Sequence, residues 1–205
     1  PAEGDLLQSV AERLLALAMG DDFEQAEAQE IANTLNGLKA VLDFGLLSAA
    51  DKQIAPLACQ LLAQIVSPHF RPHDAQPVAN AMNGLKSMLE HRVLAAEDKR
   101  LQRAATHLLQ ITHSAIFDKA TAQSVANVMN GLRSLLDYNV LPPAAALAGE
   151  AAERLLSLIT SPQFNQAIAQ NIANALMGLK TILAYRILPH EPAGTTGSKR
   201  ADEAG

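Results

Sequence analysis

A repeat of 47 residues constrains this chain more than any other feature of its sequence. The pattern Ala-Gln-x-(Ile/Val)-Ala-Asn begins at Ala28 and returns, without a gap, at Ala75, Ala122 and Ala169. Other residues recur at the same step: Phe23, Phe70, Phe117 and Phe164; Gly37, Gly84, Gly131 and Gly178; Leu14, Leu61, Leu108 and Leu155. The chain therefore divides into four repeats, 1–47, 48–94, 95–141 and 142–188, followed by a tail over 189–205.

The composition of the 205-residue chain favours helices throughout. Hydrophobic residues make up 49% and charged residues 18%, which is enough apolar material for a core and too little charge for a disordered chain. Alanine and leucine dominate, whereas aromatic residues, which favour strands, make up 3%. We therefore expect an all-α protein and exclude a β-sandwich or barrel.

Each repeat has the pattern of two helices joined by a turn. In the second repeat, apolar residues spaced three and four apart predict a helix over 51–66. After a turn at 67–70, a second helix is expected over 74–91. Asp74 is its candidate N-cap, and Pro77 suits its first turn.

One such hairpin cannot bury both of its apolar faces, so neighbouring hairpins must stack. The sequence thus predicts an α-solenoid of four 47-residue helical hairpins over 1–188, a HEAT- or armadillo-like superhelix. The tail over 189–205, rich in Pro, Gly and alternating charge, is expected to be disordered.

The second helix of every repeat carries polar residues opposite its apolar face, here named the amide stripe. Its members are Gln29, Asn33, Asn36, Gln76, Asn80, Asn83, Gln123, Asn127, Asn130, Gln170 and Asn174. Farther along each helix the same polar face continues with Ala40, Ser87, Ser134 and Thr181, then with Asp43, Glu90, Asp137 and Ala184. A merely solvated face drifts towards Lys and Glu, so repeated amides require a reason.

Two interpretations of the amide stripe remain open. Its side chains can bond one another between stacked hairpins as a ladder, or they can form a groove that holds a peptide backbone or the edges of nucleobases. The two are evenly balanced for the Asn33 position. Recognition is favoured for Asn36, Asn83 and Asn130, because Met177 in the fourth repeat would interrupt a ladder there.

Three further positions recur beside the stripe. The basic column is Lys39, Lys86, Arg133 and Lys180, and the aromatic column is Phe44, His91, Tyr138 and Tyr185. The basic column suits a phosphate backbone or an acidic peptide, but pairing with Asp43, Glu90 and Asp137 four residues later is favoured. The aromatic column is expected to cap the hairpin core rather than to stack on bases. The repeated glycine is expected to let helices of neighbouring repeats approach closely.

Catalytic and metal sites find little support in this sequence. Polar residues recur in columns, whereas catalysis needs different groups that converge. His69 and His73 are separated by Pro72, and the single Cys59 excludes a cysteine metal cage. We therefore expect no enzyme activity, no catalytic residue, no cofactor and no metal. No apolar run reaches the roughly 18 residues that span a membrane, so we expect a soluble, cytoplasmic-type protein.

The string Phe-x4-Ala-Gln-x-(Ile/Val)-Ala-Asn-x-(Leu/Met)-Asn-Gly-Leu, clearest over 23–38 and 117–132, resembles two known repeat families. It is similar to the SKWP-type tandem helical repeats of type III effectors from plant-pathogenic bacteria, although the Ser-Lys-Trp-Pro signature itself is absent. It also resembles the octotricopeptide repeats of organellar RNA-binding proteins. The first resemblance implies a virulence protein secreted into a host cell, and the second implies RNA binding.

These observations predict a non-enzymatic scaffold that binds a protein or an extended peptide through the amide stripe and the basic column. RNA is the alternative ligand, placed second because the net charge is −5 and aromatic residues are scarce. Apolar residues at both ends of the array favour end-to-end self-association or dependence on further repeats. Because the chain starts at Pro1 without Met, we expect a fragment of a larger effector, although removal of an initiator Met leaves the same start.

Overall fold

A computed structural model describes residues 3–188, and within them every regular element is helical. The α-helices are α1 (Glu3–Ala18), α2 (Ala28–Asp43), α3 (Ile54–Ile65), α4 (Gln76–Glu90), α5 (Lys99–Ile111), α6 (Ala122–Asp137), α7 (Ala146–Ile159) and α8 (Ala169–Ala184). Three short 3-10 helices, η1 (Asp21–Gln25), η2 (Ala115–Lys119) and η3 (Pro162–Gln166), precede α2, α6 and α8. The all-α prediction is confirmed, whereas the prediction of a disordered tail falls on 189–205, outside the described residues.

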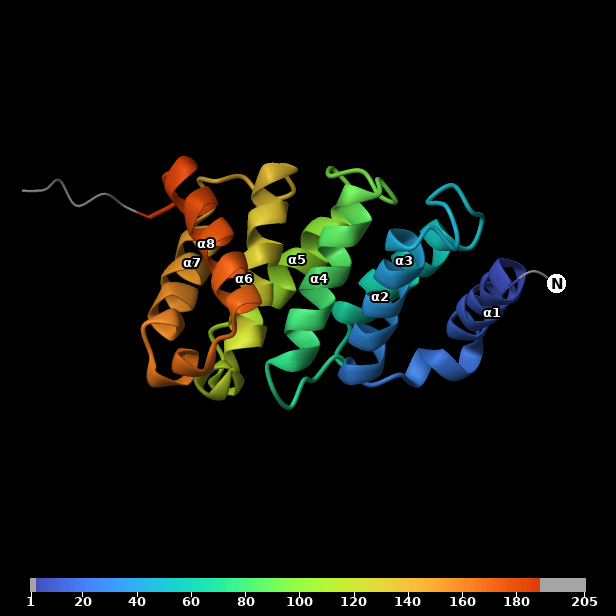
Figure 1. Cartoon of the computed structure of the whole chain (residues 1–205), viewed down its shortest axis with the longest axis horizontal. Coiled ribbons are helices and arrows are strands. Elements are labelled where there is room, and N and C mark those ends of the chain that lie inside the picture. The colour runs from blue at the N-terminus through green and yellow to red at the C-terminus, as the bar shows by residue number, and fades with distance from the viewer. Residues whose placement is uncertain (1–2, 189–205) are drawn as a thin grey trace, which may run out of the picture.

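The helices form two adjoining rows (Figure 1). The even-numbered helices pack on one another in chain order, as α2 on α4, α4 on α6 and α6 on α8, and these are the most extensive contacts. The odd-numbered helices form the second row, and α3, α5 and α7 each pack against the even-numbered helix before them. One continuous hydrophobic core runs between the rows. This packing agrees with a helical repeat.

The helix boundaries follow from local capping. The helix predicted over 51–66 is α3, which begins three residues later, at Ile54, and ends at Ile65. α4 begins at Gln76, two residues after the predicted start. The prediction of Asp74 as N-cap is wrong by one residue, because Ala75 holds that position and the Asp74 carboxylate instead accepts the backbone N–H of Gln76 at 2.8 Å. Pro77 lies in the first turn, as expected.

The even-numbered helices all end in the same way. The second residue after each helix adopts the left-handed conformation: Gly45, Arg92, Asn139 and Arg186, with φ between 51° and 64°. The next backbone N–H then bonds back into the last turn, as from Leu46 to the carbonyl of Val41 at 3.0 Å and from Val140 to that of Leu135 at 2.8 Å. Residues at 47-residue spacing thus give each helix the same exit direction.

No helix within residues 3–188 is long and apolar enough to cross a membrane.

The repeated glycine lies where even-numbered helices meet. A methyl group added to Gly84 would lie 2.7 Å from Cβ of Leu35 on α2, and one added to Gly131 would lie 2.8 Å from Cβ of Met82 on α4. Gly178 is similarly placed, 3.1 Å from Cβ of Met129 on α6. At Gly37, at the start of the row, an added methyl group has no neighbour within 4 Å. The predicted close approach at glycine is therefore confirmed for the three pairs of adjacent helices.

We expect Gly131→Ala to lower the free energy of unfolding by about 1–3 kcal/mol, because its methyl group would overlap Met82. The matched control, Gly37→Ala, should raise it by up to about 1 kcal/mol, because alanine favours the helix and nothing obstructs its side chain. Urea denaturation of the two variants and the parent protein measures both changes. Equal effects at the two positions would contradict the close contact.

Candidate binding surface

The amide stripe lies on α2, α4, α6 and α8, and on α2, α4 and α8 its glutamine and asparagine side chains pair along the helix. Gln29 Nε2 donates to Asn33 Oδ1 at 2.8 Å, and Gln76 Nε2 donates to Asn80 Oδ1 at 2.7 Å. Gln170 and Asn174 repeat this bond on α8 at 3.1 Å. This pairing fixes the orientation of the bonded amides. The glutamine carbonyls and the N–H groups that the pairing does not use remain available for other hydrogen bonds.

The stripe is also joined across helices at two places. Asn80 Nδ2 donates to Asn33 Oδ1 at 3.1 Å, which links α4 to α2. Ser124 Oγ, on α6, donates to Gln76 Oε1 at 3.4 Å. Within residues 3–188, no corresponding bond continues from Asn80 to Asn127 or from Asn127 to Asn174. The ladder interpretation is therefore confirmed for one step of the asparagine position and stops there.

Exposure divides the stripe into an accessible part and a buried part. Gln29, Asn33 and Asn36 are exposed, and their counterparts Gln123 and Gln170 are exposed as well. The remaining amides, Gln76, Asn80, Asn83, Asn127, Asn130 and Asn174, are half-buried. Fully exposed amides thus lie on α2, α6 and α8, and the amides of α4 between them are only partly accessible.

The prediction that the polar face continues outward through Ser87, Ser134 and Thr181 is wrong, because all three side chains are buried. Each lies three residues after the repeated glycine, on the helix side that packs against the preceding even-numbered helix. The hydroxyl groups are satisfied nearby: Ser134 Oγ donates to the carbonyl of Asn130 at 3.2 Å. A helical wheel drawn for one helix alone does not include the neighbouring helix that covers them.

The basic column is largely neutralised by acidic residues on the same helix. Lys39 pairs with Asp43, Lys86 Nζ lies 2.6 Å from Glu90 Oε2, and Arg133 Nε lies 3.9 Å from Asp137 Oδ2. The fourth member, Lys180, has Ala184 four residues later and makes no ion pair within residues 3–188. The pairing predicted from the spacing is confirmed for all three acidic partners.

The aromatic column does not cap the core, contrary to the prediction. Its four members follow the last residues of α2, α4, α6 and α8. Phe44 is 82% exposed, and Tyr138 and Tyr185 are also exposed. His91 is half-buried, and its Nε2 lies 2.8 Å from Asp43 Oδ1 on the preceding even-numbered helix. Each of these residues is the C-cap of its helix, and the column lies at the surface rather than over the core.

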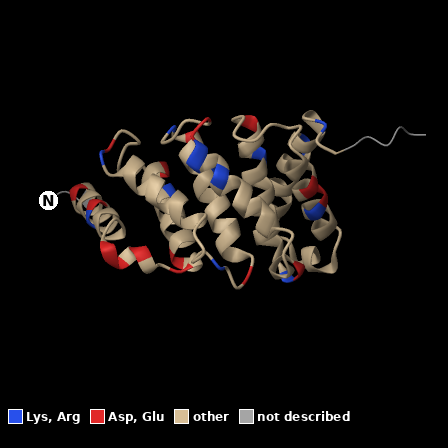
Figure 2. Ribbon diagram, turned by 180° about the vertical axis from the view of Figure 1, so that it is seen from behind, with Lys and Arg blue, Asp and Glu red and all other residues tan. Residues whose placement is uncertain are grey.

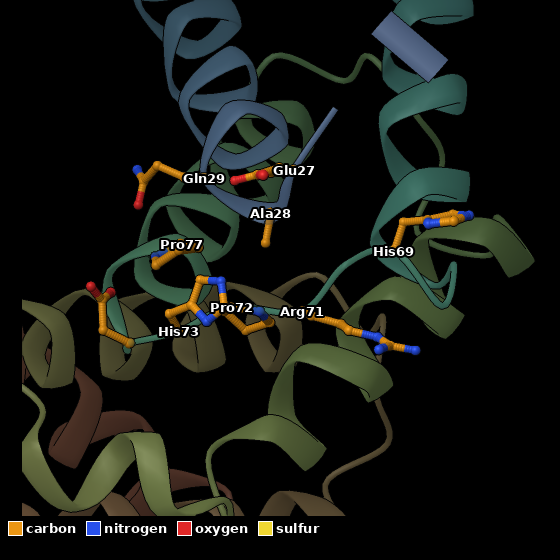
Figure 3. A pocket seen from close by; sticks show the side chains of 9 residues that line it. Glu27, Ala28, Gln29, His69, Arg71, Pro72, His73 and Pro77 are labelled. Carbon is orange, nitrogen blue, oxygen red and sulfur yellow. The ribbon is translucent and has the colours of Figure 1, made fainter. Parts of the chain in front are cut away.

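Two polar hollows lie at the N-terminal ends of the even-numbered helices, next to the glutamines of the stripe. The first, about 290 Å³, is lined by Glu27, Gln29, Arg71, His73 and Asp74 (Figure 3). The second, about 430 Å³, is lined by Gln76, Lys119, Thr121, Gln123 and Asn171. Sequence reasoning missed the lining residues outside the stripe, because they lie in turns that differ from repeat to repeat.

The two histidines considered as a metal pair do not converge. Figure 3 shows His69 and His73 on opposite sides of the segment that carries Arg71 and Pro72. In the part of the chain that the structure describes, no group of three or more His, Cys, Asp or Glu side chains could hold a metal ion.

Asp43 is the most connected charge at the surface. Partial burial raises the pKa of its carboxyl, but hydrogen bonds and charge attraction from Lys39 and His91 outweigh this effect, and the net pKa is lowered. A lowered pKa means that the stabilisation is present above the unfolded-state value and is lost as the pH falls through the folded-state value. Asp43 therefore joins α2 to α4 while its carboxyl is ionised, and this contribution is lost as the pH falls through its lowered folded-state pKa.

We expect Asp43→Asn to lower the free energy of unfolding by about 0.5 kcal/mol at neutral pH and low salt. The difference from the parent protein should shrink as the pH falls from about 4 through the lowered folded-state pKa, because the carboxyl of the parent then becomes neutral, as the amide of the variant already is. Glu90→Gln is the control, because Glu90 pairs with Lys86 on its own helix. A difference for Asp43→Asn that stays constant across this pH range would contradict the assignment.

No protein-family model, curated protein or solved structure matches this chain.

Proposed function

We propose that this chain is a non-enzymatic α-solenoid of four 47-residue hairpins, HEAT- or armadillo-like, that binds an extended peptide along the amide stripe. The observation that carries the proposal is the set of exposed amides on α2, α6 and α8, joined by the half-buried amides of α4, in one row of packed helices. Each amide group offers both donors and acceptors, which are the groups that an extended peptide backbone presents. The secreted-effector assignment rests on the sequence resemblance alone.

The spacing of the helices suits a short extended segment. Packed helices lie about 8–10 Å apart, so the four even-numbered helices span roughly 25–30 Å. An extended peptide rises about 3.3 Å per residue, and about eight residues would therefore cross the stripe. This amounts to two or three peptide residues for each helix, so each helix can contribute one amide contact to the ligand backbone.

Charge favours a peptide over RNA. Nucleic-acid binding draws most of its affinity from unpaired cations that neutralise phosphates. Three of the four basic-column residues are engaged by carboxylates, and the chain carries a net charge of −5. Figure 2 shows Lys and Arg scattered among acidic residues on the far side, with no continuous basic band. The observation that keeps RNA as the alternative is the exposed aromatic column, since exposed aromatic rings can stack on bases.

The test uses two probes: a library of randomised 12-residue peptides and a random-sequence RNA of 20 nucleotides, both fluorescently labelled. We expect selected peptides to bind and the RNA not to bind at physiological salt. Changing Asn36, Asn83 and Asn130 together to Ala should weaken peptide binding at least about tenfold, because the lost hydrogen bonds are not replaced. Fluorescence anisotropy measures the affinities.

Gln8→Ala combined with Gln110→Ala is the matched control, because these amides are exposed on α1 and α5, in the row of odd-numbered helices. It should leave peptide binding unchanged. Changing Lys39, Lys86, Arg133 and Lys180 to Gln separates the two ligand classes. RNA binding with a steep salt dependence that this fourfold variant abolishes would overturn the peptide proposal and establish the alternative.

A further inference from the structure

Apolar residues are exposed at both ends of the array, at positions that are buried everywhere between the ends. On α1, Leu7, Val10 and Leu14 are 50%, 46% and 59% exposed. Their counterparts one repeat later, Ile54, Leu57 and Leu61, are fully buried, as are those on α5 and α7. The difference lies in the neighbour: α3 packs against α2 of the preceding repeat, whereas nothing within residues 3–188 precedes α1.

The opposite end has the reciprocal pattern. On α8, Ile172, Leu176 and Leu183 are 47%, 60% and 61% exposed. The corresponding residues on α6, Val125, Met129 and Leu136, are at most 2% exposed, because α8 covers them. The face that α6 offers to α8 is thus repeated on α8, with apolar residues retained and no described element packed on it. Natural arrays place polar residues on such terminal faces.

An apolar groove at the first end matches the exposed face at the last. It lies between α1 and α2, measures about 400 Å³, and is lined by Leu14, Leu15, Phe23, Gly37, Leu38 and Val41. The equivalent place in the second repeat is filled: Leu35 of the preceding repeat lies against Gly84 there. At Gly37 the same space is open. Leu176 holds the position in the fourth repeat that Leu35 holds in the first.

We propose that two copies of this chain join head to tail, with α8 of one copy docked into the groove between α1 and α2 of the next. Leu176 then lies against Gly37 of the second copy, as Leu35 lies against Gly84 within one chain. The joint repeats the packing of α2 with α4, so the occupant that fits is a repeat of this same sequence. The proposal does not depend on the ligand of the amide stripe.

Polar and aromatic residues at the two ends complement each other in the same way. Within the chain, Gln60 and Arg154 each donate to the carbonyl of the last turn of the preceding odd-numbered helix, at Ala18 and at Thr112. Arg13 holds this position in the first repeat, where it would meet the carbonyl of Ile159 in a preceding copy. Phe44 corresponds to His91, whose partner is Asp43, but in a preceding copy the place of Asp43 is taken by Ala184.

The pairing of Phe44 with Ala184 is therefore apolar where the internal pairing is ionic. Phe44 replaces His91 and Ala184 replaces Asp43, so both positions change from polar to apolar and remain suited to contact with each other. Phe44 is the most exposed large hydrophobic residue among those described, and the joint would cover it. Because the groove and the exposed α8 face are different surfaces, the contact is heterologous and extends into longer assemblies unless the curvature closes a ring.

The test is sedimentation velocity of the whole chain over a concentration series. We expect the sedimentation coefficient of the parent protein to rise with concentration. Gly37→Glu blocks the groove without a clash inside the monomer, because no atom of a neighbour lies within 4 Å of an added Cβ. Leu176→Glu blocks the opposite end at an exposed position. Each variant should lose association by at least about tenfold.

Mixing the two variants separates a specific joint from apolar stickiness. The Leu176→Glu chain keeps its groove and the Gly37→Glu chain keeps its α8 face, so the mixture should form a 1:1 dimer that cannot extend further. Ser157→Glu is the charge-matched control. Ser157 is exposed, and so are Ala63 and Gln110, which hold the same position in the second and third repeats. This position therefore stays outside the contacts between repeats, and the variant should associate like the parent protein.

A parent chain that remains monomeric over the whole series would overturn the proposal and leave the end faces to a different occupant. Equal association of the parent, Gly37→Glu and Leu176→Glu chains would overturn it as well, because association would then use another surface. Failure of the mixture to form a dimer, with both variants folded by circular dichroism, would exclude the head-to-tail geometry.

Discussion

The close contact between successive even-numbered helices determines the arrangement of everything around it. At Gly84, Gly131 and Gly178 the neighbouring helix approaches until no side chain fits between them. This approach fixes the distance between the helices and buries the hydroxyl residue one turn later. It also brings Asn80 within hydrogen-bonding distance of Asn33 and His91 within reach of Asp43. A glycine costs about 1 kcal/mol in an isolated helix, and here the packing that it permits offsets the cost.

The sequence was sufficient to predict the helical class, the α3 segment and the glycine contacts. These features depend on periodicity within about 16 residues or on a repeated small residue, both of which are visible in one dimension. The starting residue of α4 was not predictable, because Asp74 has equivalent hydrogen bonds available to it at the N-cap and one residue before it. Small differences in free energy between such alternative hydrogen bonds decide where a helix begins.

The candidate surface was predicted less completely, because the exposure of its residues depends on which other helices pack beside them. The basic-column pairs lie within one helix, so spacing alone identified them. Ser87 and Ser134 were misplaced because their burial comes from another helix. Phe44 is exposed because no described even-numbered helix precedes α2, whereas His91 contacts Asp43 on the helix before it. The polar hollows were not found, because residues such as His73 and Lys119 follow no repeated pattern.

The shared helix ending has a consequence for how such a chain can change in length. Because Gly45, Arg92, Asn139 and Arg186 occupy the same left-handed position, every even-numbered helix passes to the next segment in one direction. A gene rearrangement that adds or removes 47 codons would join one such exit to an equivalent entry, and each helix would meet a neighbour of the same kind. An insertion of one or two residues within a helix would rotate the following apolar residues away from the core. Recombination between repeats can therefore alter the length of the array in whole units while the fold is preserved.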